Sequence, residues 1–332
     1  MVENMNRDKV LVTGASGFLG SHVCEACNEA GYEVHALVRP SSSLQWLNQD
    51  WLYVHKSGYE NLQAIAEILT KVDYVIHCAG VMATTSRNEA DARETNLGIT
   101  RRLAEESVKA GIKRFVFTSS LAAGGPGQGP EARTEDDPDN PVSDYGRSKK
   151  EAEQMLSSMS GRLSTVILRY SMIYGPRDRN IFSFFKRARG RFIPLTGKRT
   201  IYTSIVHVMD AARAAVCALV AKIQPGSVYQ ITDGVQYTMD SIYGFIEDSL
   251  GKKERGRRIR IPMRLVTLIA WFNHDILKIR DVSPDQVRQF KGLYWFATPA
   301  KARRELGWEP EIDIVKGMSE VVKWYHKHGW LT

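Results

Sequence analysis

A tyrosine and a lysine stand four residues apart at Tyr145 and Lys149, within the segment Asp144-Tyr-Gly-Arg-Ser-Lys149. On a helix this spacing places both side chains on one face, one turn apart. A free tyrosine has a pKa of about 10 and carries protons poorly near neutral pH. An adjacent ammonium favours phenolate and would lower that pKa towards the range of efficient acid/base work. Because such pairs are also common on surface helices, the interpretation depends on the elements that position this one.

The first of these elements is the glycine-rich stretch Lys9–His22, KVLVTGASGFLGSH. Its apolar start is typical of a buried strand, its glycines of a tight turn, and Ser21 onward of a helix. Such a turn brings backbone N–H groups and the positive end of a helix up to a pyrophosphate. An ordinary strand-turn-helix corner is the alternative. We expect a dinucleotide to contact Gly14, Ser16, Gly17, Phe18, Leu19 and Gly20.

Strands and helices alternate along the chain as far as Ser120. Expected strands lie at Tyr32–Arg39, near Trp51–His55, at Asp73–Gly80 and at Lys113–Ser120, with helices between them. This alternation predicts an α/β fold, a Rossmann-type doubly wound parallel sheet, whose ligands lie at the carboxyl ends of the strands. We assign residues 1–170 to the dinucleotide-binding domain. Residues 171–332 form mainly a smaller C-terminal substrate-binding lobe, with some segments returning to the Rossmann core.

The end of the second expected strand indicates which dinucleotide is preferred. An acidic residue about 20 positions after the glycines would bind the ribose 2′-hydroxyl of NAD and repel the extra phosphate of NADP. Here that neighbourhood holds Val38 and Arg39, followed by Pro40 and three serines. NADP(H) is therefore favoured and NAD(H) is the alternative; Arg39 as a solvated strand-end arginine is the structural alternative.

Composition excludes several other classes of protein. The 332 residues are 43% hydrophobic and 25% charged, as in a soluble globular protein, and the net charge of +8 is spread along the chain without a nucleic-acid-binding motif. Cys24 and Cys27 have CxxC spacing but no second pair, so we expect packing and no metal site. There is no signal peptide and no apolar run of membrane-spanning length, so a cytoplasmic location is expected.

A polar loop from Leu121 to Ser143, rich in glycine, proline and acidic residues, separates the Ser119-Ser120 strand end from Tyr145. It is too polar for the core and long for a plain connector, so it either covers a site or is simply flexible.

The ordered motifs of the chain resemble the extended short-chain dehydrogenase/reductase superfamily, in the branch of NAD-dependent epimerases and dehydratases, 3β-hydroxysteroid dehydrogenases and flavonoid reductases. The resemblance covers nearly the whole chain. Its motifs are TGASGFLG at Thr13–Gly20, HCAG at His77–Gly80, Asn96, FTSS ending at Ser120, YGRSK at Tyr145–Lys149, LRYSMIYGPRD from Leu168, and IVHVMD ending at Asp210.

This resemblance implies roles for individual residues. Tyr145 would be the general acid/base, Lys149 would lower its pKa and hold the nicotinamide ribose, and Ser120 would hydrogen-bond the substrate oxygen. Ser119 is the competing serine, and Asn96 would be a structural or proton-relay residue. Further expected contacts are Ala79 and Gly80 to the cofactor, and Ser119, Met172 and Tyr174 to the substrate.

Three departures from the family pattern concern ligand specificity. Where many members have an acidic residue that contacts adenine, this chain offers Gly58. Galactose epimerases carry an asparagine where Met172 stands, and a diphosphate-binding arginine where Thr203 stands. Loss of that bidentate contact argues against a nucleotide sugar, although Arg177, Arg179 or Arg199 could substitute.

The C-terminal half is more apolar than a sugar site requires. Ile181–Phe192 and Ile261–Leu277 are rich in aromatic and aliphatic residues, and the latter follows Gly251–Arg260, which holds six basic residues among ten. A basic run beside an amphipathic helix is typical of a segment on an anionic membrane surface. A lid helix packed on the core is the alternative. Both interpretations favour a hydrophobic substrate, and the first adds peripheral contact of residues 251–277 with the inner membrane surface.

We therefore predict an NADP(H)-dependent oxidoreductase, a ketone reductase of lipid metabolism that moves hydride between nicotinamide and a carbonyl or secondary alcohol. A 3-oxo lipid or sterol-like ketone is the expected substrate. One alternative is a nucleotide-sugar 4-epimerase or dehydratase with tightly bound NAD. The other is a non-catalytic dinucleotide-binding scaffold, against which the presence of both Tyr145 and Lys149 argues. The resemblance also implies a homodimer formed by the Tyr145 helix and the helix near residues 97–110.

Overall fold

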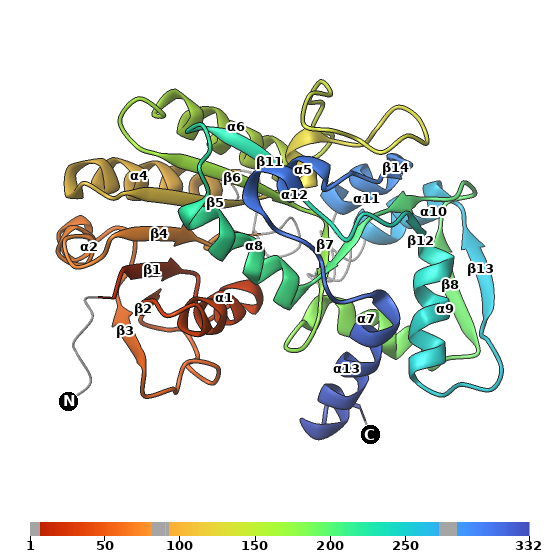
Figure 1. Ribbon diagram of the computed structural model, residues 1–332. Helices are drawn as coiled ribbons and strands as arrows, with labels where there is room; N and C mark the ends of the chain where they lie inside the picture. The colour runs from red at the N-terminus through yellow and green to blue at the C-terminus, as the bar shows by residue number, and fades with distance from the viewer. Residues whose placement is uncertain (1–6, 82–89, 91–92, 272–283, 332) are drawn as a thin grey trace.

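The computed structural model describes residues 7–81, 90, 93–271 and 284–331. Its centre is a seven-stranded parallel sheet in the order β11-β6-β5-β4-β1-β2-β3 (Figure 1). The strands are β1 Lys9–Thr13, β2 Glu33–Val38, β3 Leu52–Lys56, β4 Tyr74–His77, β5 Arg114–Ser120, β6 Thr165–Tyr170 and β11 Ser227–Ile231. The expected doubly wound sheet is confirmed.

Helices cover both faces of this sheet. Because the inner strands are buried on both sides, their sequences are nearly continuous apolar runs. One face packs against α1 Phe18–Glu29, α8 Val208–Val220 and α12 Ala300–Leu306. The other face packs against α2 Leu62–Leu69, α4 Ile99–Ala110 and α6 Asp144–Ser158.

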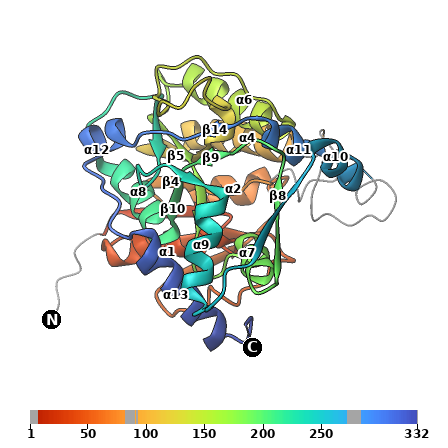
Figure 2. The same cartoon turned by 90° about the vertical axis from the view of Figure 1, so that its right-hand side faces the viewer.

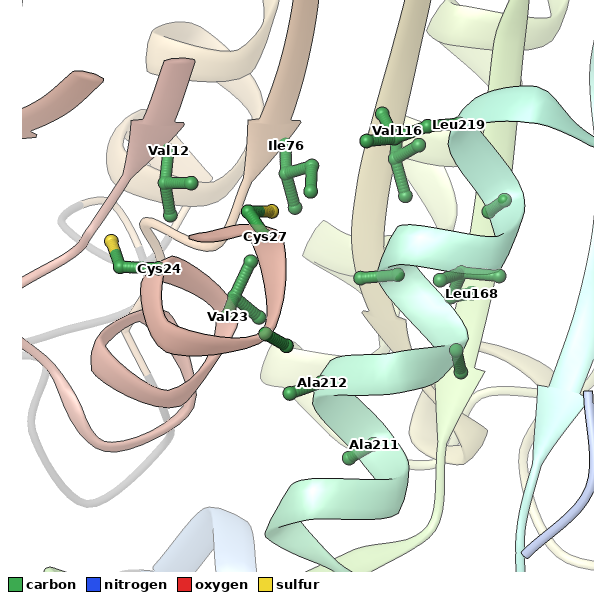
Figure 3. Close-up of a cluster of buried hydrophobic side chains, with 14 of the residues drawn as sticks. Val12, Val23, Cys24, Cys27, Ile76, Val116, Leu168, Ala211, Ala212 and Leu219 are labelled. Atoms are coloured by element: carbon green, nitrogen blue, oxygen red, sulfur yellow. The ribbon is translucent and has the colours of Figure 1, made fainter. Parts of the chain in front are cut away.

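The first of these faces shows why α1 and α8 carry small residues. Val23, Cys24 and Cys27 of α1 point towards the sheet, and the alanines of α8 lie beside them (Figure 3). Small side chains allow two helices to lie close together on one sheet face. Both α1 cysteines are buried free thiols, in agreement with the expected packing role.

The C-terminal lobe is built from short strands and helices around its own apolar core. Its strands form three small sheets, β10-β7, β12-β9-β14 and β13-β8. They are β7 Met172–Tyr174, β8 Phe192–Thr196, β9 Tyr202–Thr203, β10 Ile205–His207, β12 Tyr237–Thr238, β13 Arg257–Ile261 and β14 Tyr294–Trp295. Its helices are α7 Arg179–Ala188, α9 Met239–Ser249, α10 Met263–Trp271, α11 Pro284–Lys291 and α13 Ile314–Lys327.

Two views place this lobe relative to the sheet. The β8–β13 pair and α9 form the edge of the molecule farthest from the β1–β3 side (Figure 1), and α10 projects beyond the body beside β13 (Figure 2). In the described part of the chain no helix is long and apolar enough to cross a membrane.

Two sequence expectations change in the structure. The expected loop from Leu121 begins with a short helix, α5 Leu121–Gly124, because Ser120 caps it through its side chain. The expected helix over Ile261–Leu277 begins later, because β13 extends to Ile261 and α10 starts at Met263; residues 272–277 lie outside the described residues.

Candidate functional site

The strand order reverses between β1 and β4, and the two turns that follow these strands meet there. Gly14 follows β1 with a φ of +66°, and a Cβ on it would lie 2.7 Å from the Ala79 nitrogen. Any side chain at Gly14 would therefore collide with the turn after β4. Ligands of doubly wound sheets bind at this type of switch point.

The start of α1 lies at this same crevice. Gly17 is its N-cap, and neither a side-chain cap nor an acidic residue occupies its first turn. A side chain at Gly20 would overlap the Gly14 carbonyl, so the turn can only be this tight with glycine. The uncapped N–H groups, the positive end of the helix and the space cleared by the glycines fit a dinucleotide pyrophosphate.

The end of β2 lies next to this turn, because β1 and β2 pair with Thr13 opposite Leu37. Arg39 is the first residue after the strand and is exposed. Tyr59, which sequence reasoning did not single out, hydrogen-bonds Thr13 and the Gly14 backbone, and burial raises its pKa to about 12. The glycine turn is therefore bordered by an exposed arginine and by a buried phenol.

Tyr145 and Ser120 come together from two elements. Ser120 ends β5 and its Oγ accepts a hydrogen bond from the Ala122 N–H at 3.2 Å. Tyr145 stands in the first turn of α6, and its side chain shares a hydrogen bond with Ser120. Burial raises the pKa of Tyr145, and the bond to Ser120 only partly offsets that rise. Burial opposes the expected lowering of this pKa by Lys149, and that lowering stays a prediction.

Ser119 faces a different environment. Its hydroxyl donates a 2.5 Å hydrogen bond to Glu153, which also forms a buried ion pair with Arg169. Successive residues of a strand point to opposite faces, so Ser119 and Ser120 cannot both face Tyr145. The structure corrects the proposal of Ser119 as a substrate contact, because its hydroxyl is already bonded within a charged network.

Lys149 is buried, and its amine lies close to Gly80 in the turn that follows β4. Its Nζ donates a 2.9 Å hydrogen bond to the Thr118 carbonyl and lies 4.6 Å from the centre of the Phe117 ring. A Cβ on Gly80 would be 3.1 Å from this Nζ, so the glycine keeps a path open to the amine. Burial lowers the pKa of Lys149 to about 8.

Asn96 holds the turn after β4 in place. It lies in the π-helical turn η1 Glu94–Gly98; its Oδ1 accepts from the Val81 N–H and its Nδ2 donates to the Val81 carbonyl, both at 3.0 Å. Nδ2 also donates to Ser148 Oγ at 3.0 Å, in the turn between Tyr145 and Lys149. Single π-helical turns are frequent at functional sites. Asn96 therefore connects the Gly80 turn to the Tyr145 helix.

Met172 and Tyr174 lie on β7 of the lobe. Met172 is partly buried against the lobe core, whereas Tyr174 is almost fully buried in that core, with its ring against His207. Its hydroxyl is 3.5 Å from the Asp313 carbonyl. Tyr174 therefore packs the lobe, and the expectation that it contacts substrate is corrected.

The start of α6 is held by a residue that sequence reasoning missed. Asp285 of α11 accepts hydrogen bonds from the N–H groups of Asp144, at 2.7 Å, and Tyr145, at 3.2 Å. Gln289 of the same helix donates a 3.1 Å hydrogen bond to Ser143, the N-cap of α6. A carboxylate at a helix N-terminus is stabilising. The only local signal was a Pro-Asp helix start at residues 284 and 285, and nothing in it points to Tyr145.

Comparison with known proteins identifies the family. A family model described as the NAD dependent epimerase/dehydratase family matches residues 10–232. The chain belongs to that family. It is an extended short-chain dehydrogenase/reductase, as the motifs predicted, and a nicotinamide-dinucleotide-binding protein.

Relatives that span nearly the whole chain include enzymes named for lipid substrates. The chain is 28% identical to a sterol-4-alpha-carboxylate 3-dehydrogenase (decarboxylating) of Dictyostelium discoideum, over 94% of this chain and 99% of that one. It is 26% identical to a ceramide reductase of Caulobacter vibrioides, over 98% and 96%. A UDP-glucose 4-epimerase of Vibrio cholerae is 32% identical, over 56% of this chain and 58% of its own.

Solved structures of this fold include nucleotide-sugar epimerases. A UDP-glucose 4-epimerase of Thermotoga maritima matches with a TM-score of 0.77 and 24% identity, over 96% of this chain and 99% of that one. A UDP-glucuronic acid 4-epimerase of Bacillus cereus, in complex with NAD, matches with 0.76 and 22%, over 96% and 99%. At this identity these likenesses establish the fold alone.

Within the described residues no group of histidine, cysteine and acidic side chains could hold a metal ion. Cys24 and Cys27 lie inside α1, where burial raises the pKa of both thiols. Their CxxC spacing therefore has a packing explanation, as expected.

Proposed function

We propose that this protein is an NADP(H)-dependent oxidoreductase that reduces the ketone of a hydrophobic substrate. The observation that carries the proposal is the hydrogen-bonded pair of Tyr145 and Ser120 at the end of β5, whose phenol is protonated near neutral pH. A protonated phenol is the group that a carbonyl needs as it becomes an alcohol. The bound nicotinamide supplies the hydride.

The other residues position this pair. The Ser120 hydroxyl stands where it can orient the substrate oxygen towards the Tyr145 phenol. The buried Lys149 Nζ faces Gly80 and is suited to hold the hydroxyls of a cofactor ribose. Asn96 fixes the Gly80 turn against Ser148, which keeps these groups in register. In this scheme the chain donates a proton from Tyr145 and stabilises the oxygen through Ser120.

A hydrophobic substrate is supported by the lobe and by the relatives. Thr203 is buried and its hydroxyl bonds to the Ser204 carbonyl, so it supplies no charge to a diphosphate. Met172, on strand β7, is likewise uncharged. Relatives matched over most of both chains are named as sterol, steroid and ceramide enzymes. The proposal extends that chemistry to a 3-oxo lipid or sterol-like ketone.

NADP(H) is supported by the end of β2. Arg39 is exposed beside the glycine turn, and its neighbours Val38 and Pro40 bring no carboxylate to this position. An arginine can bind a 2′-phosphate through paired N–H groups, whereas an acidic residue here would repel it. The expected homodimer through α4 and α6 stays a prediction.

The experiment is a fluorescence titration of purified protein with NADPH and with NADH, after testing whether nucleotide co-purifies. Tight NADPH binding to empty protein, followed by NADPH-dependent reduction of hydrophobic ketones, is the expected result. Firmly retained NAD with no preference for the phosphate would contradict the proposal. That outcome would favour a nucleotide-sugar epimerase or dehydratase, since several solved proteins of this fold are named as nucleotide-sugar epimerases.

A further inference from the structure

The β8–β13 ribbon presents apolar side chains to solvent. The two strands pair in parallel with Phe192 opposite Arg257 and Pro194 opposite Ile259, so these four residues share one face. The opposite face carries Ile193 and Leu195, which are buried in the core of the lobe. The outward face therefore needs no apolar residues for folding, yet Phe192 is 53% exposed and Ile259 is 43% exposed.

The helix that follows adds to this surface. Gly197, which follows β8, donates its N–H to the Ile261 carbonyl, and a Cβ on Gly197 would lie 3.5 Å from the end of the Met263 side chain, so α10 starts against the ribbon. Leu265 and Leu268 lie on one side of α10, three residues apart, and are 47% and 59% exposed. We call Phe192, Pro194, Ile259, Leu265 and Leu268 the ribbon face. The strands β8 and β13 lie at the outer edge of the lobe in Figure 1, and α10 projects beyond the body in Figure 2.

Basic residues surround the ribbon face. The segments 189–199 and 257–268 contain eight arginines and lysines and no acidic residue. Arg258 is turned inward and pairs with Asp240 and Glu247. Among the residues that the structure describes, no carboxylate pairs with the exposed cations of the two segments, which include Arg191, Lys198, Arg257 and Arg260.

We propose that the ribbon face and its surrounding cations dock on the surface of an anionic lipid bilayer. Aromatic and aliphatic side chains enter the boundary between headgroups and acyl chains, while arginine and lysine bind anionic headgroups. A second copy of the chain is a poorer occupant. In a two-fold dimer this face would meet itself and place the cations of β13 close to those of the partner. This docking does not depend on the proposed reaction.

The test is flotation of the full-length protein with two kinds of vesicle, phosphatidylcholine alone and phosphatidylcholine containing phosphatidylglycerol. We expect binding to the anionic vesicles only, weakened by salt. The variant Ile259→Glu/Leu268→Glu should bind about tenfold more weakly, because it places two carboxylates on the ribbon face. The matched control Val220→Glu adds a carboxylate at a 63% exposed position on α8 and should bind as wild type does.

A second pair of variants tests the charges. Arg257→Glu should weaken binding, whereas Arg162→Glu, at an exposed arginine of the Rossmann domain, should not. Circular dichroism and NADPH titration of each variant establish that it folds. No binding to anionic vesicles, or equal binding by the Ile259→Glu/Leu268→Glu variant, would overturn the proposal. So would a dimer in sedimentation that this variant dissociates, since the face would then join two copies. None of these readouts depends on ketone reduction. A negative result for membrane binding would therefore not contradict the proposed function.

Discussion

The backbone N–H of Tyr145 donates a 3.2 Å hydrogen bond to the carboxylate of Asp285, a residue 140 positions away. Through this bond and the one to Asp144, a helix of the C-terminal lobe holds the start of the helix that carries Tyr145. Arg288 of α11 also pairs with Asp144. The position of the Tyr145 phenol is therefore coupled to the docking of the substrate lobe.

This coupling makes Asp285 a positioning residue. Asp285→Ala should lower kcat about tenfold through misplacement of Tyr145, with the KM for NADPH unchanged. Asp285→Asn keeps a hydrogen-bond acceptor and should restore most of the rate. Steady-state kinetics of both variants provide the measurement. The control is Asp248→Ala, which removes an exposed carboxylate paired with Arg255. A rise in KM for NADPH together with an unchanged kcat would contradict this role.

Replacing the two serines at the end of β5 should have different effects on kcat and on the free energy of unfolding. Ser120→Ala removes the partner of Tyr145 and should reduce kcat by about a hundredfold. Because Ser120 also caps α5, the variant should lose about 1 kcal/mol of stability. Ser119→Ala removes one hydrogen bond to the buried carboxylate of Glu153, which still pairs with Arg169, and should cost about 2 kcal/mol in stability, with kcat nearly unchanged. Kinetics and urea unfolding of both variants test this. A Ser119→Ala variant that is stable and inactive would contradict this prediction and would assign the functional role to Ser119.

The buried Lys149 should lower the free energy of unfolding at pH 7. Burial lowers its pKa from about 10.5 to about 8, so between these values the unfolded chain binds more protons than the folded one. Stability due to this group therefore rises with pH through that window, and the full cost, about 3 kcal/mol, is present at pH 7. Lys149→Met should abolish activity and yet raise the free energy of unfolding at pH 7 by about 2 kcal/mol, allowing for the lost bond to Thr118.

Urea unfolding at pH 7 and at pH 10 is the measurement for Lys149. The gain from Lys149→Met should shrink at the higher pH, where the wild-type amine is already neutral. Lys109→Met, at an exposed lysine, should show no such difference between the two pH values. Destabilisation of the Lys149→Met variant at pH 7 would show that the amine stabilises the fold.

Arg39 should discriminate between the two cofactors. Arg39→Ala should weaken NADPH binding about tenfold or more and leave NADH binding within about twofold, because only NADPH carries the 2′-phosphate. Fluorescence titration of both cofactors provides the test. Equal losses of affinity for NADPH and NADH would mean that Arg39 supports the site without binding the 2′-phosphate.

The sheet and the glycine turn were predictable because their signals are local. Val10 to Val12 form an uninterrupted apolar run. Gly14 has a positive φ, a backbone conformation that glycine adopts more readily than other residues. Tyr145 and Lys149 share a helix, so their spacing alone places them on one face. The register Thr13 opposite Leu37 then brings Arg39 beside the turn.

Other features depend on contacts between distant segments. The acceptor for the Tyr145 N–H comes from Asp285, and no local pattern connects the two residues. The choice between Ser119 and Ser120 depended on the Glu153–Arg169 pair, which is formed by a helix and the next strand. The direction of the Tyr145 pKa depended on burial, which sequence does not display. Tyr174 was assigned to substrate by resemblance, whereas packing places it in the core.

The most direct test of the account is to follow hydride from cofactor to product. Purified enzyme is incubated with NADPH deuterated at nicotinamide C4 and with hydrophobic ketones, and products are analysed by mass spectrometry. We expect an alcohol that carries deuterium from one face of the nicotinamide, equimolar NADP⁺, and loss of both in Tyr145→Phe. Isomerisation or dehydration of a nucleotide sugar by retained NAD, with no net oxidation of added NADPH, would contradict it.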